Sequence, residues 1–142
     1  MKQIIFRNHT EDARGNVLTV LYNYRVDYNG KSFLIPRGFE SDGASVPRLF
    51  WPLVFSPTDS HAATAGICHD WIYRDQPEEW TREEADRMFL ALLVEFGVGI
   101  WSANRAYDAL RLFGGFAWDE NKALKETAEA AAALKAEASK KK

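Results

Sequence analysis

Two stretches decide the fold of this chain: His69-Asp70-Trp71-Ile72-Tyr73, and Arg82-Glu83-Glu84-Ala85-Asp86-Arg87-Met88-Phe89. Residues four apart lie on the same face of a helix, so His69 and Tyr73 share one face of the first helix. Asp86 lies beside the apolar ladder of the second helix, which continues through Phe89. Because the link between the stretches is short, we expect the two helices to pack antiparallel, with Asp86 facing His69 and Tyr73.

Start and stop signals give the helix boundaries. Asp59 or Ser60 can cap a first helix that runs to about residue 74. Thr81-Arg82-Glu83-Glu84 is a capping box, and it predicts a second helix over 82–96. A third helix is expected from residue 101 or 102 to Gly114-Gly115, because glycine commonly ends helices.

The residues before the helices predict strands. Residues 3–37 contain an alternating, β-branched and aromatic run, and Asn29-Gly30 is a strong hairpin signal. We therefore expect a small antiparallel sheet that ends at Pro36. Residues 37–59 carry turn residues and single apolar anchors, which predicts a packed connection with at most short helical turns.

The expected fold class is α+β: a small N-terminal antiparallel sheet, then a three-helix bundle. Residues 1–118 are expected to form one domain, since 142 residues with 46% apolar composition suit a single core. Residues 119–142 are rich in Ala, Glu and Lys and have few large apolar side chains. They predict a solvent-exposed helix or a frayed tail that is dispensable for folding.

Composition excludes several classes. A net charge of -2 does not suggest a nucleic-acid surface, and the single cysteine, Cys68, allows no intramolecular disulfide. We expect no membrane span, because no stretch approaches about 20 apolar residues. The N-terminus lacks the long apolar stretch of a signal peptide, so none is expected.

A carboxylate on a buried stripe needs a partner, and the facing helix offers the imidazole of His69 and the phenol of Tyr73. An Asp–His pair orients the imidazole ring and leaves its other nitrogen free as a base. His69, Asp86 and Tyr73 are therefore candidate catalytic residues. The same hydrogen bonds can also hold two helices together without any chemistry, and the spacing alone does not decide between these interpretations.

The stretch Ser41-Asp42-Gly43-Ala44-Ser45 forms a second candidate cluster. Asp42-Gly43 has the composition of a turn, and the simplest interpretation is structural. In a functional interpretation, Asp42 is a metal ligand or a second carboxylate, Ser45 is a nucleophile or a polar contact, and Ser41 is a further loop candidate. Three arginines lie near the link between the two helices: Arg74, Arg82 and Arg87. We expect them to pair with the neighbouring carboxylates, which are Asp75, Glu78, Glu79 and Glu83.

The order of these motifs resembles the DUF1353 family over roughly residues 15–118. The resemblance is carried by Gly38-Phe39-Glu40-Ser41-Asp42-Gly43-Ala44-Ser45-Val46-Pro47-Arg48, His69-Asp70-Trp71-Ile72-Tyr73, Arg82-Glu83-Glu84-Ala85-Asp86-Arg87-Met88-Phe89, and Tyr107-x-x-Leu110-Arg111-x-x-Gly114. Members are mostly encoded by tailed bacteriophages and prophages, and their function is not established. The resemblance therefore implies a phage origin more than an activity.

The two-helix segment also resembles secreted phospholipase A2, in which a His-Asp-x-x-Tyr helix faces a helix bearing an Asp. By position, this resemblance implies that His69 is the base, oriented by Asp86 and supported by Tyr73. It implies that Asp70 is a calcium ligand, with Asp42 able to contribute. The disulfides of that family are absent here, and its glycine-rich calcium loop is not recognisable before His69 unless the Asp42-Gly43 loop replaces it.

Two hypotheses for function follow. In the first, the chain is a hydrolase-like phage protein with a His69/Asp86 dyad, acting on an ester or lipid bond, with calcium as a possible cofactor. In the second, it is a non-catalytic phage protein that binds a virion or host partner, and the tail is the contact element. Either would place it in the infected host cytoplasm or the virion. Solvent access to His69 distinguishes the two hypotheses.

Overall fold

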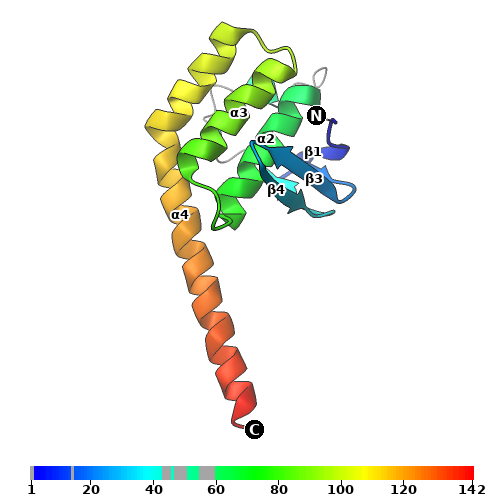
Figure 1. Ribbon diagram of the computed structural model, residues 1–142. Coiled ribbons are helices and arrows are strands. Elements are labelled where there is room, and N and C mark those ends of the chain that lie inside the picture. The colour runs from blue at the N-terminus through cyan, green and yellow to red at the C-terminus, as the bar shows by residue number, and fades with distance from the viewer. Residues whose placement is uncertain (1, 14, 43–45, 47–50, 55–59) are drawn as a thin grey trace.

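The computed structural model describes residues 2–13, 15–42, 46, 51–54 and 60–142, and it confirms the predicted α+β architecture (Figure 1). Small antiparallel sheets come first, and helices follow. The last helix extends far beyond the rest of the molecule. The elements are β1 (Phe6–Asp12), β2 (Gly15–Val20), β3 (Tyr24–Tyr28), β4 (Lys31–Ile35), β5 (Glu40–Ser41), α1 (Trp51–Val54), α2 (Ser60–Asp75), α3 (Arg82–Glu95) and α4 (Ile100–Lys140).

The strands form two small sheets rather than one. β1, β2 and β5 make a three-stranded antiparallel sheet, and β3 and β4 make a separate hairpin. The predicted turn at Asn29-Gly30 is confirmed: both residues have positive φ, 50° and 77°, as a type I′ turn requires. The alternation on the hairpin buries Val26, Phe33 and Ile35 against the helices.

Helix α2 lies at the centre of the molecule. Every residue from Ala62 to Asp70 is buried, and α2 packs against α1, α3, α4 and β5. A helix buried on nearly all sides must satisfy its polar side chains internally. The Thr64 hydroxyl accepts a hydrogen bond from the backbone N–H of Ile4 at 3.0 Å. His69 and Asp70 face the same requirement.

Helix α3 begins with the predicted capping box. The Glu84 backbone N–H donates to the Thr81 hydroxyl at 3.2 Å, and the Thr81 N–H donates to the Glu84 carboxylate at 2.9 Å. Lys31 at the start of β4 also binds Glu84, with Nζ and Oε1 2.6 Å apart. Glu84 therefore joins the hairpin to the start of α3.

The hydrogen bond from Lys31, followed by that from the Thr81 backbone, lowers the pKa of Glu84 from its usual 4.5 to about 2. A folded-state pKa below the unfolded one contributes stability above pH 4.5, and this contribution is lost as the pH falls to about 2. We expect Glu84→Gln to be less stable than the natural chain at pH 7 and the difference to shrink across that window. Urea unfolding at several pH values measures it, and a difference that stays constant with pH would contradict the prediction.

Helix α4 differs from the prediction at its end. The expected stop at Gly114-Gly115 is wrong, because the helix continues through both glycines to Lys140. Gly114 is buried against Tyr73 of α2, and a Cβ built on it would lie 2.6 Å from the Tyr73 hydroxyl oxygen. These glycines therefore allow α4 to approach α2 and α3 closely and do not act as a cap.

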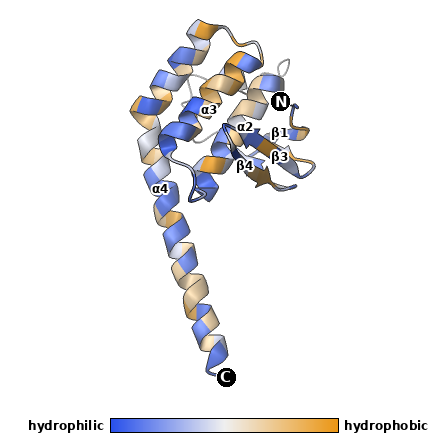
Figure 2. Ribbon diagram, in the orientation of Figure 1, coloured by the Kyte–Doolittle hydropathy of each residue, from blue (hydrophilic) through white to orange (hydrophobic). Residues whose placement is uncertain are grey.

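Beyond Lys125, every residue of α4 is exposed and the helix projects from the domain (Figure 1). Its last contact with the domain is Lys125, whose Nζ donates to the backbone carbonyls of Asp75 and Gln76 at 2.7 and 3.1 Å. Figure 2 shows hydrophilic and hydrophobic residues interspersed along this projecting part. None of the helices described is long and apolar enough to cross a membrane.

We expect truncation after Trp118 to leave the folded domain intact. Residues 119–142 are exposed except for Asn121 and Lys125, which are half-buried, so their removal loses little buried apolar area. At low micromolar concentration, the melting temperature should fall by no more than a few degrees, as followed by circular dichroism. A large drop would mean that the projecting segment is part of the folding unit.

Candidate buried His-Asp-Tyr-Arg network

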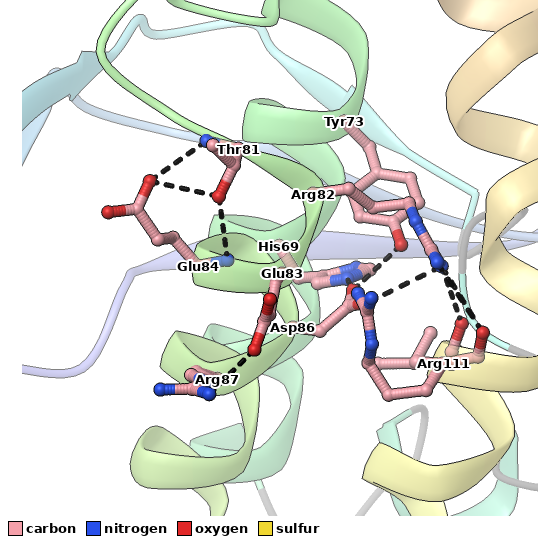
Figure 3. Close-up of polar contacts among 10 residues, drawn as sticks. His69, Tyr73, Thr81, Arg82, Glu83, Glu84, Asp86, Arg87 and Arg111 are labelled. Carbon is pink, nitrogen blue, oxygen red and sulfur yellow. Dashed lines mark hydrogen bonds and ion pairs between the residues drawn. The ribbon is translucent and has the colours of Figure 1, made fainter.

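Three helices bring the predicted residues together around one carboxylate (Figure 3). Asp86 of α3 accepts at Oδ1 from Nε2 of His69 at 2.8 Å and from the Tyr73 hydroxyl at 2.7 Å. Its other oxygen, Oδ2, accepts from Nη1 of Arg111 on α4 at 2.7 Å. The predicted meeting of His69, Tyr73 and Asp86 between antiparallel helices is confirmed.

Asp86 is fully buried, and its hydrogen bonds favour the charged form. Burial raises the pKa of its carboxyl group. The hydrogen bonds from His69, Tyr73 and Arg111 lower the pKa by more than burial raises it, so the pKa is below its usual value. Burial and the neighbouring Asp86 charge raise the pKa of Tyr73 well above its usual range. The phenol therefore stays protonated and acts as a donor to an ionised carboxylate.

Arg82 is a second cation beside Asp86. Its Nη1 lies 3.7 Å from Asp86 Oδ2, and it donates to the backbone carbonyl of Leu110 at 3.1 Å. Arg82 reaches this backbone beside Gly115, where a Cβ would lie 3.7 Å from its guanidinium carbon. It therefore joins the start of α3 to the middle of α4.

His69 has the orientation that a catalytic dyad needs, but its ring is not accessible to a substrate. Its Nε2 binds Asp86, and its Nδ1 has no hydrogen-bond partner among the residues that the structure describes. The side chain is 0% exposed, with the rings of Tyr73 and Phe89 centred 4.1 and 5.2 Å away. A general base must come within hydrogen-bonding distance of its substrate, and the described conformation leaves no room for one at Nδ1.

The two predicted metal ligands converge on an arginine. Arg74 Nη2 lies 2.7 Å from Asp42 Oδ1 and 3.2 Å from Asp70 Oδ2, and Arg74 Nη1 donates to the Glu40 carbonyl at 2.7 Å. The segment ending at Asp42 therefore contacts the C-terminal part of α2. No group of three or more acidic, histidine or cysteine side chains within the described ranges is arranged to hold a metal ion.

Of the remaining loop candidates, Ser41 and Ser45, the structure describes Ser41. Ser41 is buried on β5, where it pairs with Leu18 of β2. Ser45 lies outside the described residues. Both therefore remain predictions as functional residues.

Sequence reasoning missed the arginines of the network. Arg82 and Arg74 were expected to pair with carboxylates of the link, but they bind Asp86 and Asp70, each four residues away on the same helix. That spacing is a known signal for a helical ion pair. Arg111 belongs to the Tyr107-x-x-Leu110-Arg111 motif, which marks it as a candidate residue. Its neighbours in sequence do not predict a contact with Asp86. The expected pair of Arg87 and Glu83 is confirmed, at 2.6 Å.

The fold and network define a small α+β module whose helices are joined by a buried, charged hydrogen-bond cluster. Residues 17–110 match the family described as "Protein of unknown function (DUF1353)", and the chain belongs to this family. The matched region includes His69, Tyr73 and Asp86 and ends one residue before Arg111. No solved structure shows a significant match to the chain.

Two curated relatives come from Sinorhizobium fredii (strain NBRC 101917 / NGR234). The chain is 30% identical over 88 residues to "Uncharacterized protein y4jT", covering 62% of this chain and 26% of that protein. It is 30% identical over 103 residues to "Uncharacterized protein y4iH", covering 72% of this chain and 42% of that protein. The matches thus cover less than half the length of either relative.

Proposed function

We propose that this chain is a non-catalytic accessory or structural protein of a phage or prophage, which binds a virion or host protein. The observation that carries the proposal is the complete burial of His69. A ring enclosed by Tyr73 and Phe89 and bound to Asp86 serves to fix α2 against α3. Arg111 and Arg82 extend the same network to α4, so the network makes a rigid support for that helix.

The exposed face of α4 is the proposed contact surface. Trp101, Leu112 and Phe116 are 83%, 76% and 82% exposed, and spacings of eleven and four residues put them on one side of the helix. Leu110, two residues from Leu112, is buried, so this side faces away from the domain. Large apolar side chains gathered on an exposed face are typical of protein interaction sites.

Site-specific photo-crosslinking in host cells tests the proposal. A photoreactive phenylalanine analogue in place of Phe116 should capture a defined partner. The same analogue in place of Asn8, an exposed polar residue of β1, should not. The partner band at position 116 should also be lost in Trp101→Ser/Leu112→Ser. No band at position 116, or the same bands at both positions, would contradict the proposal.

A second candidate is a hydrolase acting on an ester or lipid bond, and one observation favours it. With Nε2 of His69 donating to Asp86, the neutral ring carries its lone pair on Nδ1, as a general base requires. This candidate needs a conformation in which Nδ1 meets a substrate. It predicts ester or phospholipid hydrolysis that disappears in His69→Gln.

In one version of the hydrolase hypothesis, a bound calcium ion assists the reaction. An ion held by Asp70 and Asp42 would have to displace the Arg74 guanidinium that now binds both carboxylates. Bound calcium would raise the melting temperature by mass action, and Asp70→Asn would remove the shift. Calorimetric titration with millimolar calcium that gives no heat, together with an unchanged melt, would remove calcium from the mechanism.

A further inference from the structure

The part of α4 that packs on the domain presents one line of four side chains to solvent: Trp101, Arg105, Asp108 and Leu112. Their spacing of four, three and four residues keeps all four on one side of the helix. Trp101 and Leu112 are 83% and 76% exposed, and the two charged residues between them are exposed as well. Because α4 runs along one edge of the molecule, a second molecule can reach this line (Figure 1).

The two charges at the middle of the line have no partner in the described part of the chain. The side chains of Arg105 and Asp108 form no hydrogen bond or ion pair there, with each other or with another residue. By contrast, Arg111 of the same helix binds Asp86 at 2.7 Å. Arg105 and Asp108 are therefore available to opposite charges of a second molecule.

The order of the four residues is complementary to itself when it is reversed. Trp101 and Leu112 are equidistant from a point between residues 106 and 107, and so are Arg105 and Asp108. A two-fold axis through this point would place Trp101 opposite Leu112 of a second helix. The same axis would place each Arg105 opposite an Asp108. The apolar and charged pairs thus share one side of α4 and one centre.

Other arrangements of two copies satisfy fewer of these side chains. A parallel pair in register would place Arg105 beside Arg105 and Asp108 beside Asp108, and like charges disfavour association. Sliding the antiparallel pair by four residues would bring Trp101 to Phe116. It would also place Arg105 opposite Leu112, with no charge facing it. The register centred between residues 106 and 107 is the one that fits all four positions.

We infer that α4 pairs antiparallel with α4 of a second copy of this chain, through residues 101–112, about a two-fold axis between residues 106 and 107. This pairing rests on the proposed function, because it occupies part of the same α4 face. Phe116 lies one turn beyond Leu112, outside the paired stretch. Two Phe116 side chains, about 29 Å apart along the helices, therefore remain for the virion or host protein.

Sedimentation equilibrium of the full chain tests the pairing. The natural chain should have twice the 16.1 kDa monomer mass at high micromolar concentration. Arg105→Asp leaves only acidic charges on the line and Asp108→Arg only basic ones, so each variant alone should associate about tenfold more weakly. An equimolar mixture of the two should recover the dimer, because every charge again faces its opposite. Lys135→Glu, which reverses an exposed charge far along α4, should behave as the natural chain.

Single cysteines test the direction of the pair. Trp101→Cys and Leu112→Cys would lie opposite each other, so an oxidised mixture of these variants should form a disulfide-linked dimer. Neither should cross-link with itself, because two copies of one position would be about 17 Å apart along the helices. The native Cys68 is buried and acts as the internal control. Cross-linking of each variant with itself would mean a parallel pair and would overturn the antiparallel register, as would no cross-linking in the mixture.

Failure of the pairing and failure of the proposed function give different results. A monomeric natural chain, or a mixture of the two charge variants that stays monomeric, would overturn the pairing. If the analogue at position 116 still captured another protein in that case, the proposed function would stand. A dimer in which position 116 captures only a second copy would support the pairing and remove the virion or host partner.

Discussion

Asp86→Asn should lower the free energy of unfolding by about 3–5 kcal/mol, since removing one partner of a buried ion pair leaves the others uncompensated. Asp86 is fully buried and accepts three hydrogen bonds, from His69, Tyr73 and Arg111. An asparagine keeps the shape but loses the charge that Arg111 and Arg82 face. Urea unfolding followed by tryptophan fluorescence measures the effect.

Glu83→Gln is the matched control for this substitution. Glu83 lies on the same helix and also pairs with an arginine four residues away, Arg87, at 2.6 Å. Both of these side chains are more than half exposed, and such a pair contributes at most about 0.5 kcal/mol. If the two variants lost similar stability, the network around Asp86 would not be what joins the helices.

Gly114→Ala should be the second strongly destabilising change. Its methyl carbon would lie 2.6 Å from the Tyr73 hydroxyl oxygen, which is held by Asp86 and by the packing of the Tyr73 ring against His69 and Trp118. Either the Tyr73–Asp86 hydrogen bond breaks or α4 moves away from α2. We expect a loss of about 1–3 kcal/mol, as for other overpacked sites.

Gly115→Ala is the control that separates this contact from helix propensity. A Cβ on Gly115 would meet Arg82 at ordinary contact distances, 3.7 Å and beyond. Because alanine favours a helix over glycine by about 1 kcal/mol, this variant should be as stable as the natural chain or more so. Chemical denaturation of both variants measures the contrast, and equal stability would contradict the close approach at Gly114.

Much of the fold could be predicted from local patterns. Asn29-Gly30 identified the hairpin, and Thr81 with Glu84 identified the start of α3, because each feature is fixed by residues adjacent in sequence. Asp86 was placed opposite His69 and Tyr73 from helical spacing alone. These are short-range signals, and all were confirmed.

The errors concern contacts between distant segments. Gly114-Gly115 was predicted to end a helix. Gly114 instead allows α4 to pack closely against Tyr73, which lies 41 residues earlier in the chain. The pairing of β5 with β2, and the separation of the β3–β4 hairpin as a second antiparallel sheet, also depend on contacts between distant segments. Arg111 joins the network only because α4 packs on α3. None of these facts has a local sequence signature.

We propose that His69 supports the fold and does no chemistry. The direct measurement compares hydrolysis of ester and phospholipid substrates, with and without calcium, by the natural chain and by His69→Gln. Glutamine can still donate to Asp86 from the position of Nε2 but cannot act as a base, so the helices stay joined while the dyad is removed. We expect the same background rate for both proteins. Turnover by the natural chain that is lost in a folded His69→Gln variant would contradict it.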